Sequence, residues 1–300
     1  MSFLILIIGF ALLIKGADVF VEGASSIAKK FNVPSMIIGL TIVAMGTSAP
    51  EAAVSVTSSL AGQNDMSVAN VVGSNFFNVL VVLGVSSIIA KLPVQEETIK
   101  KDTPFLILVS ILLLVFGINL KLGRIEGLAL LGLFTYFLVN TIKSAKKATE
   151  DDSLETGETA IAIETQTSSE ISLPKTILVS LVGIAGIVLG GDMVVNSATS
   201  IATSLGMSAN LVGLTIVAVG TSLPEFVTSI VAIKKGETEI AIGNVIGSNL
   251  FNILLVLGLA AVINPISMSM LAFIDIIFMV LITLLPVSYT HLTLPTTERV

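Results

Sequence analysis

The sequence predicts an all-α polytopic membrane protein made of two five-helix repeats with inverted topology. Three observations predict this fold class. Of the 300 residues, 54% are hydrophobic and only 12% are charged, whereas soluble domains carry about 25% charged residues. The mean hydropathy is +1.00, and a long motif recurs at one fixed offset of 174 residues. The chain is therefore expected to lie in a lipid bilayer.

Nine apolar stretches are candidates for membrane helices, since a bilayer core is crossed by about 20 apolar residues. The last stretch is short, and two complete five-helix repeats contain ten helices. We therefore expect the last helix to be truncated or missing. The nine stretches are Ser2–Val21, Met36–Leu60, Val68–Ala90, Phe105–Leu120, Glu126–Ile142, Thr176–Val195, Leu211–Ile233, Ile240–Ile263 and Ala272–Val287.

Composition divides the chain into four parts. Residues 1–143 are predicted to form the first membrane repeat, and residues 173–286 the second, cut short at its end. Residues 144–172 lack apolar periodicity and form an acidic linker. Residues 287–300 break from the apolar pattern and resemble translated vector sequence, so we interpret them as a non-native tail, with a native polar tail as the alternative.

The distribution of positive charge predicts the orientation. Eleven lysines fall in loops of one parity, and only Lys121 and Arg124 fall in loops of the other. By the positive-inside rule, the N-terminus lies outside and the 144–172 linker lies in the cytoplasm. The linker contains seven acidic residues between Glu150 and Glu170, which account for the net charge of −6. We interpret it as a solvated tether rather than as a regulatory Ca2+ site formed by Glu150, Asp151, Asp152 and Glu155.

An internal repeat is the most informative feature of the chain. GLTIVAMGTSAPE, at residues 39–51, recurs as GLTIVAVGTSLPE at 213–225 with 11 of 13 positions identical, and VANVVGSNFFN, at 68–78, recurs as IGNVIGSNLFN at 242–252. An odd number of helices in each half inverts the second half in the membrane. Inverted repeats are typical of transporters, with the substrate site between the halves near the bilayer midplane. A duplication that serves packing alone is the alternative.

Each half places one carboxylate deep in an apolar helix, Glu51 in the first and Glu225 in the second. A charge at the bilayer centre costs on the order of 3 kcal/mol, so such a residue usually faces water, a partner charge or an ion. No lysine or arginine lies at that depth in the neighbouring stretches. A cation is therefore the expected partner of both carboxylates.

A proline precedes each glutamate. Pro50 and Pro224 should break their helices and free the carbonyl groups four residues earlier, at Gly46 and Gly220. Free carbonyl groups are tolerated in a membrane only where they line a cavity or bind an ion. The two helices are therefore predicted to break beside the carboxylates and to supply backbone oxygen atoms.

Further oxygen donors recur at helical spacing. Thr47 lies four residues before Glu51, as Thr221 lies before Glu225, and Ser74–Asn78 and Ser248–Asn252 repeat this spacing on the following helices. The chain contains no cysteine, and its single histidine, His291, lies near its end. Carboxylate, hydroxyl, amide and carbonyl oxygens without nitrogen or sulfur ligands suit hard cations such as Ca2+ and Na+.

With GTS-x-P-E and GS-x-x-x-N present twice, the chain resembles the Ca2+:cation antiporter superfamily, especially the prokaryotic Na+/Ca2+ exchangers, from Met1 to about Pro286. The resemblance implies a secondary transporter of the prokaryotic plasma membrane, with alternating access and a gating bundle formed by the first and sixth helices. It implies no enzymatic activity, no cofactor and no nucleic-acid partner. Ca2+ and Na+ would be substrates, and a monomer would suffice.

The resemblance also implies roles for ten residues. Glu51 and Glu225 would be shared carboxylate ligands, Thr47 and Thr221 would offer carbonyl groups beside the Ca2+ site, and Asn78 and Asn252 would line its middle. Ser74 and Ser248 would serve flanking Na+ sites, together with backbone carbonyls of Ala44 and Ala218.

The sequence leaves the coupling ion open, since Na+, H+ or K+ could drive Ca2+ movement. Some relatives have aspartate at the position of Asn252, whereas here Asn78 and Asn252 are both amides. Two carboxylates would be neutralised by one Ca2+, and three Na+ would leave one positive charge, so electrogenic 3:1 exchange is our hypothesis.

Two other classes of protein are alternatives to an antiporter. A cation channel would share oxygen ligands, but it usually needs an oligomeric pore, which an inverted repeat inside one chain does not favour. An intramembrane aspartyl protease would need Gly-x-Gly-Asp, a pattern that fails at Leu189 before Asp192. Asp18, which recurs as Asp192, is interpreted as an interfacial or packing residue near Lys15, and Asp102 and Asp275 as interfacial residues without an assigned role.

Overall fold

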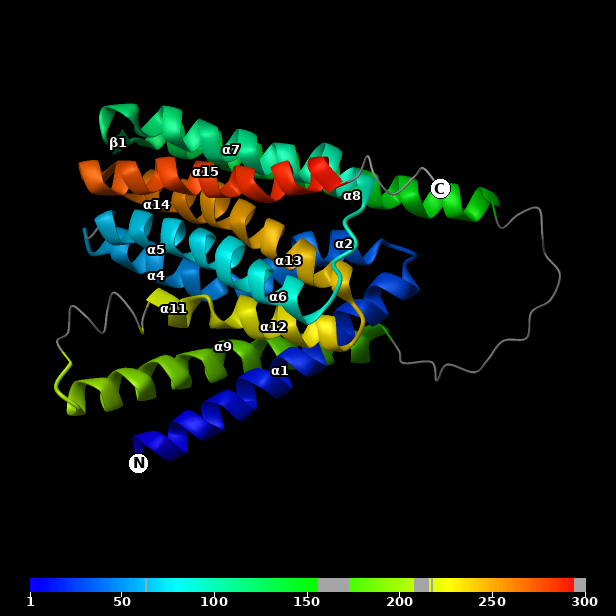
Figure 1. Cartoon of the computed structure of the whole chain (residues 1–300), viewed down its shortest axis with the longest axis horizontal. Helices are drawn as coiled ribbons and strands as arrows, with labels where there is room; N and C mark the ends of the chain where they lie inside the picture. The colour runs from blue at the N-terminus through cyan, green and yellow to red at the C-terminus, as the bar shows by residue number, and fades with distance from the viewer. Residues whose placement is uncertain (63, 156–172, 208–215, 217, 294–300) are drawn as a thin grey trace.

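The computed structural model (Figure 1) describes residues 1–62, 64–155, 173–207, 216 and 218–293, without the side chains of residues 64–65, 147–155, 218 and 285–293. Nearly all of it is helical. The first half contains α1 Ser2–Lys30, α2 Ser35–Ile38, the π-helix η1 Gly39–Val43, α3 Ala44–Thr47, α4 Ala49–Leu60, α5 Asn64–Phe77, the π-helix η2 Asn78–Val82, α6 Leu83–Ile89, the π-helix η3 Thr98–Asp102, α7 Thr103–Phe116, the 3-10 helix η4 Gly117–Asn119, strand β1 Lys121–Leu122 and α8 Arg124–Glu155. The second contains α9 Leu173–Ser204, α11 Ala218–Thr221, α12 Leu223–Lys234, α13 Thr238–Phe251, the π-helix η7 Asn252–Leu257, α14 Gly258–Ile263, strand β2 Ile266–Ser267 and α15 Met270–Thr293.

The predicted fold class is confirmed. Within the described residues, six helices are long and apolar enough to cross a membrane, and the bent pair Ser35–Thr47 and Ala49–Leu60 adds a broken span. Large apolar side chains such as Ile88, Ile125 and Leu271 are exposed on the outside of the bundle. Such exposure suits a lipid environment, whereas a soluble protein rarely exposes so much apolar surface.

The two halves repeat the same elements with opposite directions. α3, α4 and α5 recur 174 residues later as α11, α12 and α13, and the π-helices that begin at Asn78 and Asn252 follow the same offset. In Figure 1, α1 runs opposite to α9, α5–α6 opposite to α13–α14, and α7 opposite to α15. Inverted topology is therefore visible in the structure. The first part of the seventh predicted stretch, residues 211–217, lies outside the described residues except for residue 216.

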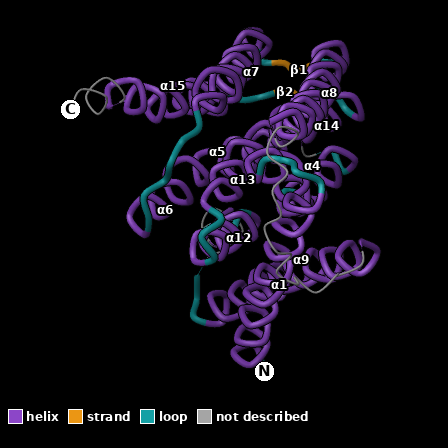
Figure 2. Tube along the Cα trace, turned by 90° about the vertical axis from the view of Figure 1, so that its right-hand side faces the viewer, coloured by secondary structure: helices purple, strands orange, loops and turns teal. Residues whose placement is uncertain are grey.

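Helices α1 and α9 form a pair beside the rest of the bundle (Figures 1 and 2). Glycines let their backbones touch: an added Cβ would lie 2.5 Å from the Leu13 nitrogen at Gly190 and 2.7 Å from the Ile187 nitrogen at Gly16. Small residues at such a crossing are the usual device for close packing in membranes. The pair is thus expected to behave as one rigid body.

The remaining helices form the core around α13, most of whose residues are buried. Glycines on α13 face the backbone of α2 and η1, where a Cβ at Gly243 would lie 2.5 Å from the Met36 carbonyl oxygen. At one end of the bundle, β1 and β2 join the halves in a short antiparallel ladder, with Leu122 opposite Ile266. The core is therefore held together across both repeats.

Two helices extend beyond the predicted domain boundaries. α8 continues to Glu155, twelve residues into the predicted linker, and α15 continues past Pro286 to Thr293. Residues 145–148 are Ala-Lys-Lys-Ala, and Ala and Lys extend an already nucleated helix easily. Apolar periodicity did not indicate this extension because the added turns need no buried face. The division into repeats, linker and tail stays a prediction.

Candidate ion-binding site

Both helices that carry the glutamates are broken at the predicted place. Between α3 and α4, Ser48 leaves the helical conformation with φ −81° and ψ 8°, and Ser222 does the same between α11 and α12 with φ −91° and ψ 3°. The axes of the first pair bend by 47°. Each proline then lies in the first turn of the new helix, where its missing N–H removes no intrahelical hydrogen bond.

Glu51 and Glu225 lie in the first turns of α4 and α12. The N-terminal end of a helix carries partial positive charge and favours a carboxylate there. Both side chains are fully buried, with 0% of their surface exposed. The helix breaks thus hold two carboxylates inside the bundle, each at a helix start.

Serines at the breaks connect the halves. Ser48 of the first half donates a hydrogen bond of 2.9 Å to Oε1 of Glu225, and Ser222 of the second half donates one of 3.4 Å to Oε1 of Glu51. Each carboxylate therefore accepts a hydrogen bond from the serine that lies three positions before the glutamate of the opposite half. The glutamates converge at the interface between the repeats.

The other predicted hydroxyl residues lie around this pair. Ser74 donates to Oε1 of Glu51 at 3.4 Å and lies 3.0 Å from the Ser222 hydroxyl. Thr47 and Ser248 lie beside Glu225, with their hydroxyl oxygens 3.4 Å apart. Two similar clusters of oxygen atoms result, one beside each carboxylate.

Asn78 and Asn252 begin the π-helices η2 and η7. Single π turns inside α-helices are frequent at functional sites, because the widened turn reorients side chains. The Asn78 amide nitrogen donates to Oδ1 of Asn249 at 3.0 Å, and that of Asn252 donates to Oδ1 of Asn75 at 3.1 Å. Both amides therefore have their nitrogen atoms occupied.

Four buried oxygen atoms of these residues have no hydrogen-bond partner. They are Oε2 of Glu51, Oε2 of Glu225, Oδ1 of Asn78 and Oδ1 of Asn252. A buried oxygen without a partner costs about 1–3 kcal/mol, and more when it is charged. Repeated at equivalent positions of both halves, this set has the chemistry of a hard-cation site.

Several site residues were not selected from the sequence. Asn70 donates to the backbone carbonyl of Glu51 at 3.2 Å, and Asn244 donates to that of Glu225 at 3.3 Å. Ser48 and Ser222, which donate to the carboxylates, are also absent from the predicted ligands. All four recur at the offset of 174 inside the repeated motifs, and this recurrence was the available signal.

The remaining predicted residues lie at the breaks. The Ala44 carbonyl accepts hydrogen bonds from the Ser48 nitrogen at 2.9 Å and from the Thr47 hydroxyl at 3.3 Å. Thr221 donates to Oδ1 of Asn70 at 3.4 Å. Gly46 and Gly220 precede the breaks within α3 and α11. Ala218 belongs to α11, but its side chain lies outside the described part.

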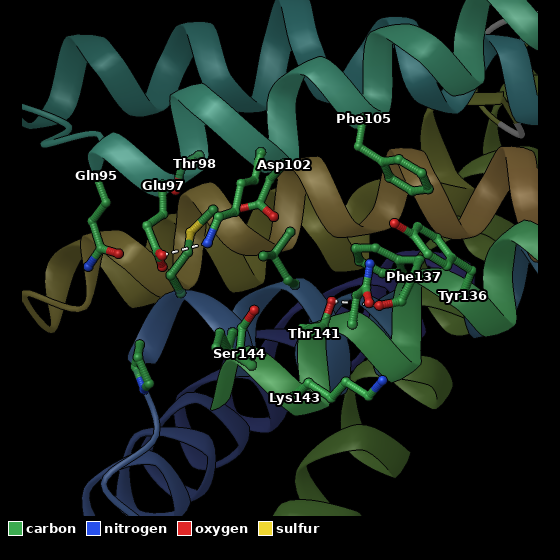
Figure 3. A pocket seen from close by; sticks show the side chains of 16 residues that line it. Gln95, Glu97, Thr98, Asp102, Phe105, Tyr136, Phe137, Thr141, Lys143 and Ser144 are labelled. Carbon is green, nitrogen blue, oxygen red and sulfur yellow. Dashed lines mark hydrogen bonds and ion pairs between the residues drawn. The ribbon is translucent and has the colours of Figure 1, made fainter. Parts of the chain in front are cut away.

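A separate pocket of about 450 Å³ lies between α2, the η3–α7 segment and α8 (Figure 3). Asp102, Glu97 and Lys101 line one side, where Lys101 pairs with Glu97 at 2.7 Å, and Phe105 and Tyr136 line another. Neither Glu51 nor Glu225 reaches this pocket. It is therefore distinct from the carboxylate site.

Two inverted repeats around a buried carboxylate pair define a membrane ion transporter rather than an enzyme. The sequence profile described as "Sodium/calcium exchanger protein" matches residues 1–143 and 175–299. The chain belongs to the sodium/calcium exchanger family, as the repeated motifs indicated, and the family is one of ion exchangers.

Named relatives agree with this assignment. The chain is 44% identical to the antiporter CaxA of Alkalimonas amylolytica over 86% of this chain and 80% of that protein. It is 33% identical to the sodium/calcium exchanger MaX1 of Methanosarcina acetivorans, over 89% and 85% of the two chains. A solved structure of the sodium-calcium exchanger NCX_Mj, soaked with 10 mM Na+ and zero Ca2+, matches with a TM-score of 0.83 and 30% identity, over 97% of this chain and 91% of that one.

Proposed function

We propose that the protein exchanges Ca2+ for Na+ across the membrane by alternating access. The observation that carries this proposal is the set of four buried oxygens without partners on Glu51, Glu225, Asn78 and Asn252. Two carboxylates balance the charge of one Ca2+, and two amide oxygens complete a ligand set without nitrogen or sulfur. The names of MaX1 and NCX_Mj support Na+ as the counter-ion.

The ligand roles are those that the resemblance implies, and the two clusters of oxygen atoms support them. Ca2+ would bind between Glu51 and Glu225, with the Thr47 and Thr221 carbonyls beside it and Asn78 and Asn252 lining the middle. Na+ would bind on either side, one ion near Ser74 and another near Ser248, with help from the Ala44 and Ala218 carbonyls. Ser222 and Ser48 contact the same carboxylates and are added to these flanking sites.

The transporter would act as a monomer in a prokaryotic plasma membrane, because each oxygen cluster combines residues from both halves of one chain. Its N-terminus would lie outside and the 144–172 linker in the cytoplasm, in accordance with the lysine distribution.

Transport of 45Ca2+ into proteoliposomes tests the function and its coupling ion. With the protein reconstituted, an outward Na+ gradient should drive Ca2+ uptake, whereas K+ and pH gradients of the same size should not. Uptake driven by a pH or K+ gradient alone would favour an H+- or K+-coupled antiporter. Uptake without any counter-ion gradient, in proportion to membrane voltage, would favour a channel.

The charge balance predicts that exchange is electrogenic. If three Na+ replace one Ca2+, each cycle moves one net positive charge, and a valinomycin-clamped K+ potential should shift the Na+ gradient at which net Ca2+ flux is zero. A reversal point that is independent of voltage would contradict the 3:1 stoichiometry.

Alternating access requires the α1–α9 pair to slide against the core, and ion pairs hold α1 at one end. Lys235, after α12, lies 2.9 Å from Asp18 and 3.4 Å from Glu22, and Lys29 lies 3.3 Å from Glu237. Burial lowers the pKa of Lys235, but hydrogen bonds and attraction from the two acids raise it more, so its pKa lies above the usual value. The lysine is therefore charged at neutral pH. Lys15 also approaches Asp18, at 3.9 Å.

We expect Lys235→Ala to reduce the equilibrium population of this conformation relative to the alternative one by about threefold. Partly exposed ion pairs are each worth roughly 0.2–1 kcal/mol. The chain contains no cysteine, so spin labels on Lys30→Cys and Lys234→Cys can report the distance between α1 and α12 by pulsed electron resonance. Lys100→Ala, which removes an ion pair with Glu96 four residues away, is the matched control. Equal distance distributions in the two variants would contradict the role of Lys235.

A further inference from the structure

Four asparagines cross-link the two halves beside the proposed ion site. Asn75 of α5 accepts from Asn252, and Asn249 of α13 accepts from Asn78. All four side chains are at most 2% exposed. Of these four asparagines, only Asn78 and Asn252 have a role in the proposed function.

The neighbours of the Asn75 amide nitrogen determine which end of this amide faces Asn252. The Asn75 amide nitrogen donates to the backbone carbonyl of Asn249 at 3.3 Å and faces Sδ of Met279 at 3.6 Å. Both groups can only accept a hydrogen bond. The oxygen of Asn75 must therefore face Asn252, and the Asn252 amide nitrogen must donate the hydrogen bond to it.

These hydrogen bonds also orient the oxygen atoms of the Asn252 and Asn78 amides. With the nitrogen of Asn252 held by Asn75, Oδ1 of Asn252 points away from that bond, and it is one of the buried oxygens without a partner. Asn78 is held in the same way by Oδ1 of Asn249, and its own Oδ1 is also without a partner. Both halves thus present an amide oxygen, and not an amide nitrogen, to the site.

We propose that Asn75 and Asn249 are positioning residues that lock the amides of Asn252 and Asn78 with their oxygens toward the transported ion, a role that rests on the proposed function. An amide group has nearly the same shape after a half turn, so packing alone selects its orientation weakly. A flipped amide would direct two N–H groups at a cation and repel it. The cross-links therefore help to make the site selective for hard cations.

A double-mutant cycle separates this role from simple packing between the halves. Asn75→Leu keeps the volume but removes the acceptor, and it should weaken Ca2+ binding about tenfold, which corresponds to about 1.4 kcal/mol. Because Asn75 acts through Asn252, adding Asn75→Leu to Asn252→Leu should weaken binding no further. Asn249→Leu with Asn78→Leu should give the same pattern.

Binding is measured on the full chain in detergent from the increase in melting temperature with CaCl2 or NaCl, and in proteoliposomes from the Ca2+ concentration that gives half-maximal 45Ca2+ uptake. The matched control is Asn264→Leu, which removes another amide, one that donates to the Ser59 carbonyl at 3.2 Å. The control should leave the apparent affinity for Ca2+ unchanged. Maximal uptake should fall less than affinity in Asn75→Leu, whereas loss of packing alone would lower maximal uptake and leave affinity unchanged.

Independent, additive losses from Asn75→Leu and Asn252→Leu would overturn the proposal. If Asn75→Leu does not fold, Asn75→Ala carries the same cycle with a smaller expected loss, about threefold, because a water molecule can accept the bond. If NaCl but not CaCl2 stabilises the wild-type protein, Ca2+ exchange alone is rejected. The double-mutant cycle is then measured with Na+ as the bound ion. A wild-type protein stabilised by neither ion would reject both proposals.

Discussion

Glu51→Gln and Glu225→Gln are each expected to reduce Na+-driven Ca2+ uptake by about a hundredfold or more. Either change keeps the shape of the side chain but removes one of the two negative charges in a fully buried site. Hydrogen bonds to a charged group are worth roughly 1.5–3 kcal/mol, which corresponds to about one to two powers of ten in affinity, and the low dielectric constant around a buried site increases this energy. Initial rates of 45Ca2+ uptake into proteoliposomes provide the measurement.

The same variants should be at least as stable as the wild type when no ions are present. In an empty site, a charge on either fully buried carboxyl group has no cation to balance it and is costly, and a neutral isostere removes that cost. CaCl2 should then raise the melting temperature of the wild type but not of either variant. Unfolded variants or undiminished uptake would contradict this account. The exposed Glu96→Gln, outside the site, should behave as wild type in both assays.

Much of the fold and the centre of the site could be predicted from the sequence, because the membrane leaves few explanations for a buried charge. Glu51 and Glu225 stood out against apolar surroundings, and their shared offset of 174 residues placed them in equivalent positions of two halves. Pro50 and Pro224 then located the helix breaks, since proline cannot continue the hydrogen-bond ladder. These inferences need only local chemistry and repetition.

The cross-links between the halves could not be predicted in this way. The repeat shows that Asn75 and Asn249 occupy equivalent positions. It does not show that Asn75 bonds Asn252, or that Asn249 bonds Asn78, across the two halves. Those partners are 177 and 171 residues apart in the chain, and only the packing of inverted helices brings them together. The charged contacts at Lys235 are a further example, because the equivalent residue in the first half is Ala61. A residue that differs between the two repeats, such as Lys235, has no repeated counterpart from which its contacts could be predicted.

The second large effect is expected from Gly247→Ala, one residue before Ser248. An added Cβ would lie 2.5 Å from the Leu40 carbonyl oxygen and 2.7 Å from Cβ of Ala44. The first neighbour is rigid backbone, so α13 must move away from η1 and α3, and such overpacking costs about 1–3 kcal/mol of stability. Since α13 carries Ser248 and α3 carries Thr47, the movement separates oxygen donors that face each other. We expect a drop in Ca2+ uptake of more than tenfold, because displacements of about 1 Å can reduce the activity of a preorganised site a hundredfold.

Gly132→Ala gives the matched control for this prediction. Gly132 lies within α8 and an added Cβ there would meet no atom within 4 Å, so the change should leave uptake intact. It should also raise the melting temperature slightly, since alanine is favoured over glycine in a helix by about 1 kcal/mol. If both variants show the same melting temperature and the same uptake, contact between α13 and the broken helix is not what holds the two sets of oxygen donors in place. A loss of uptake in Gly247→Ala alone, with Ca2+ affinity reduced, ties that contact to ion binding.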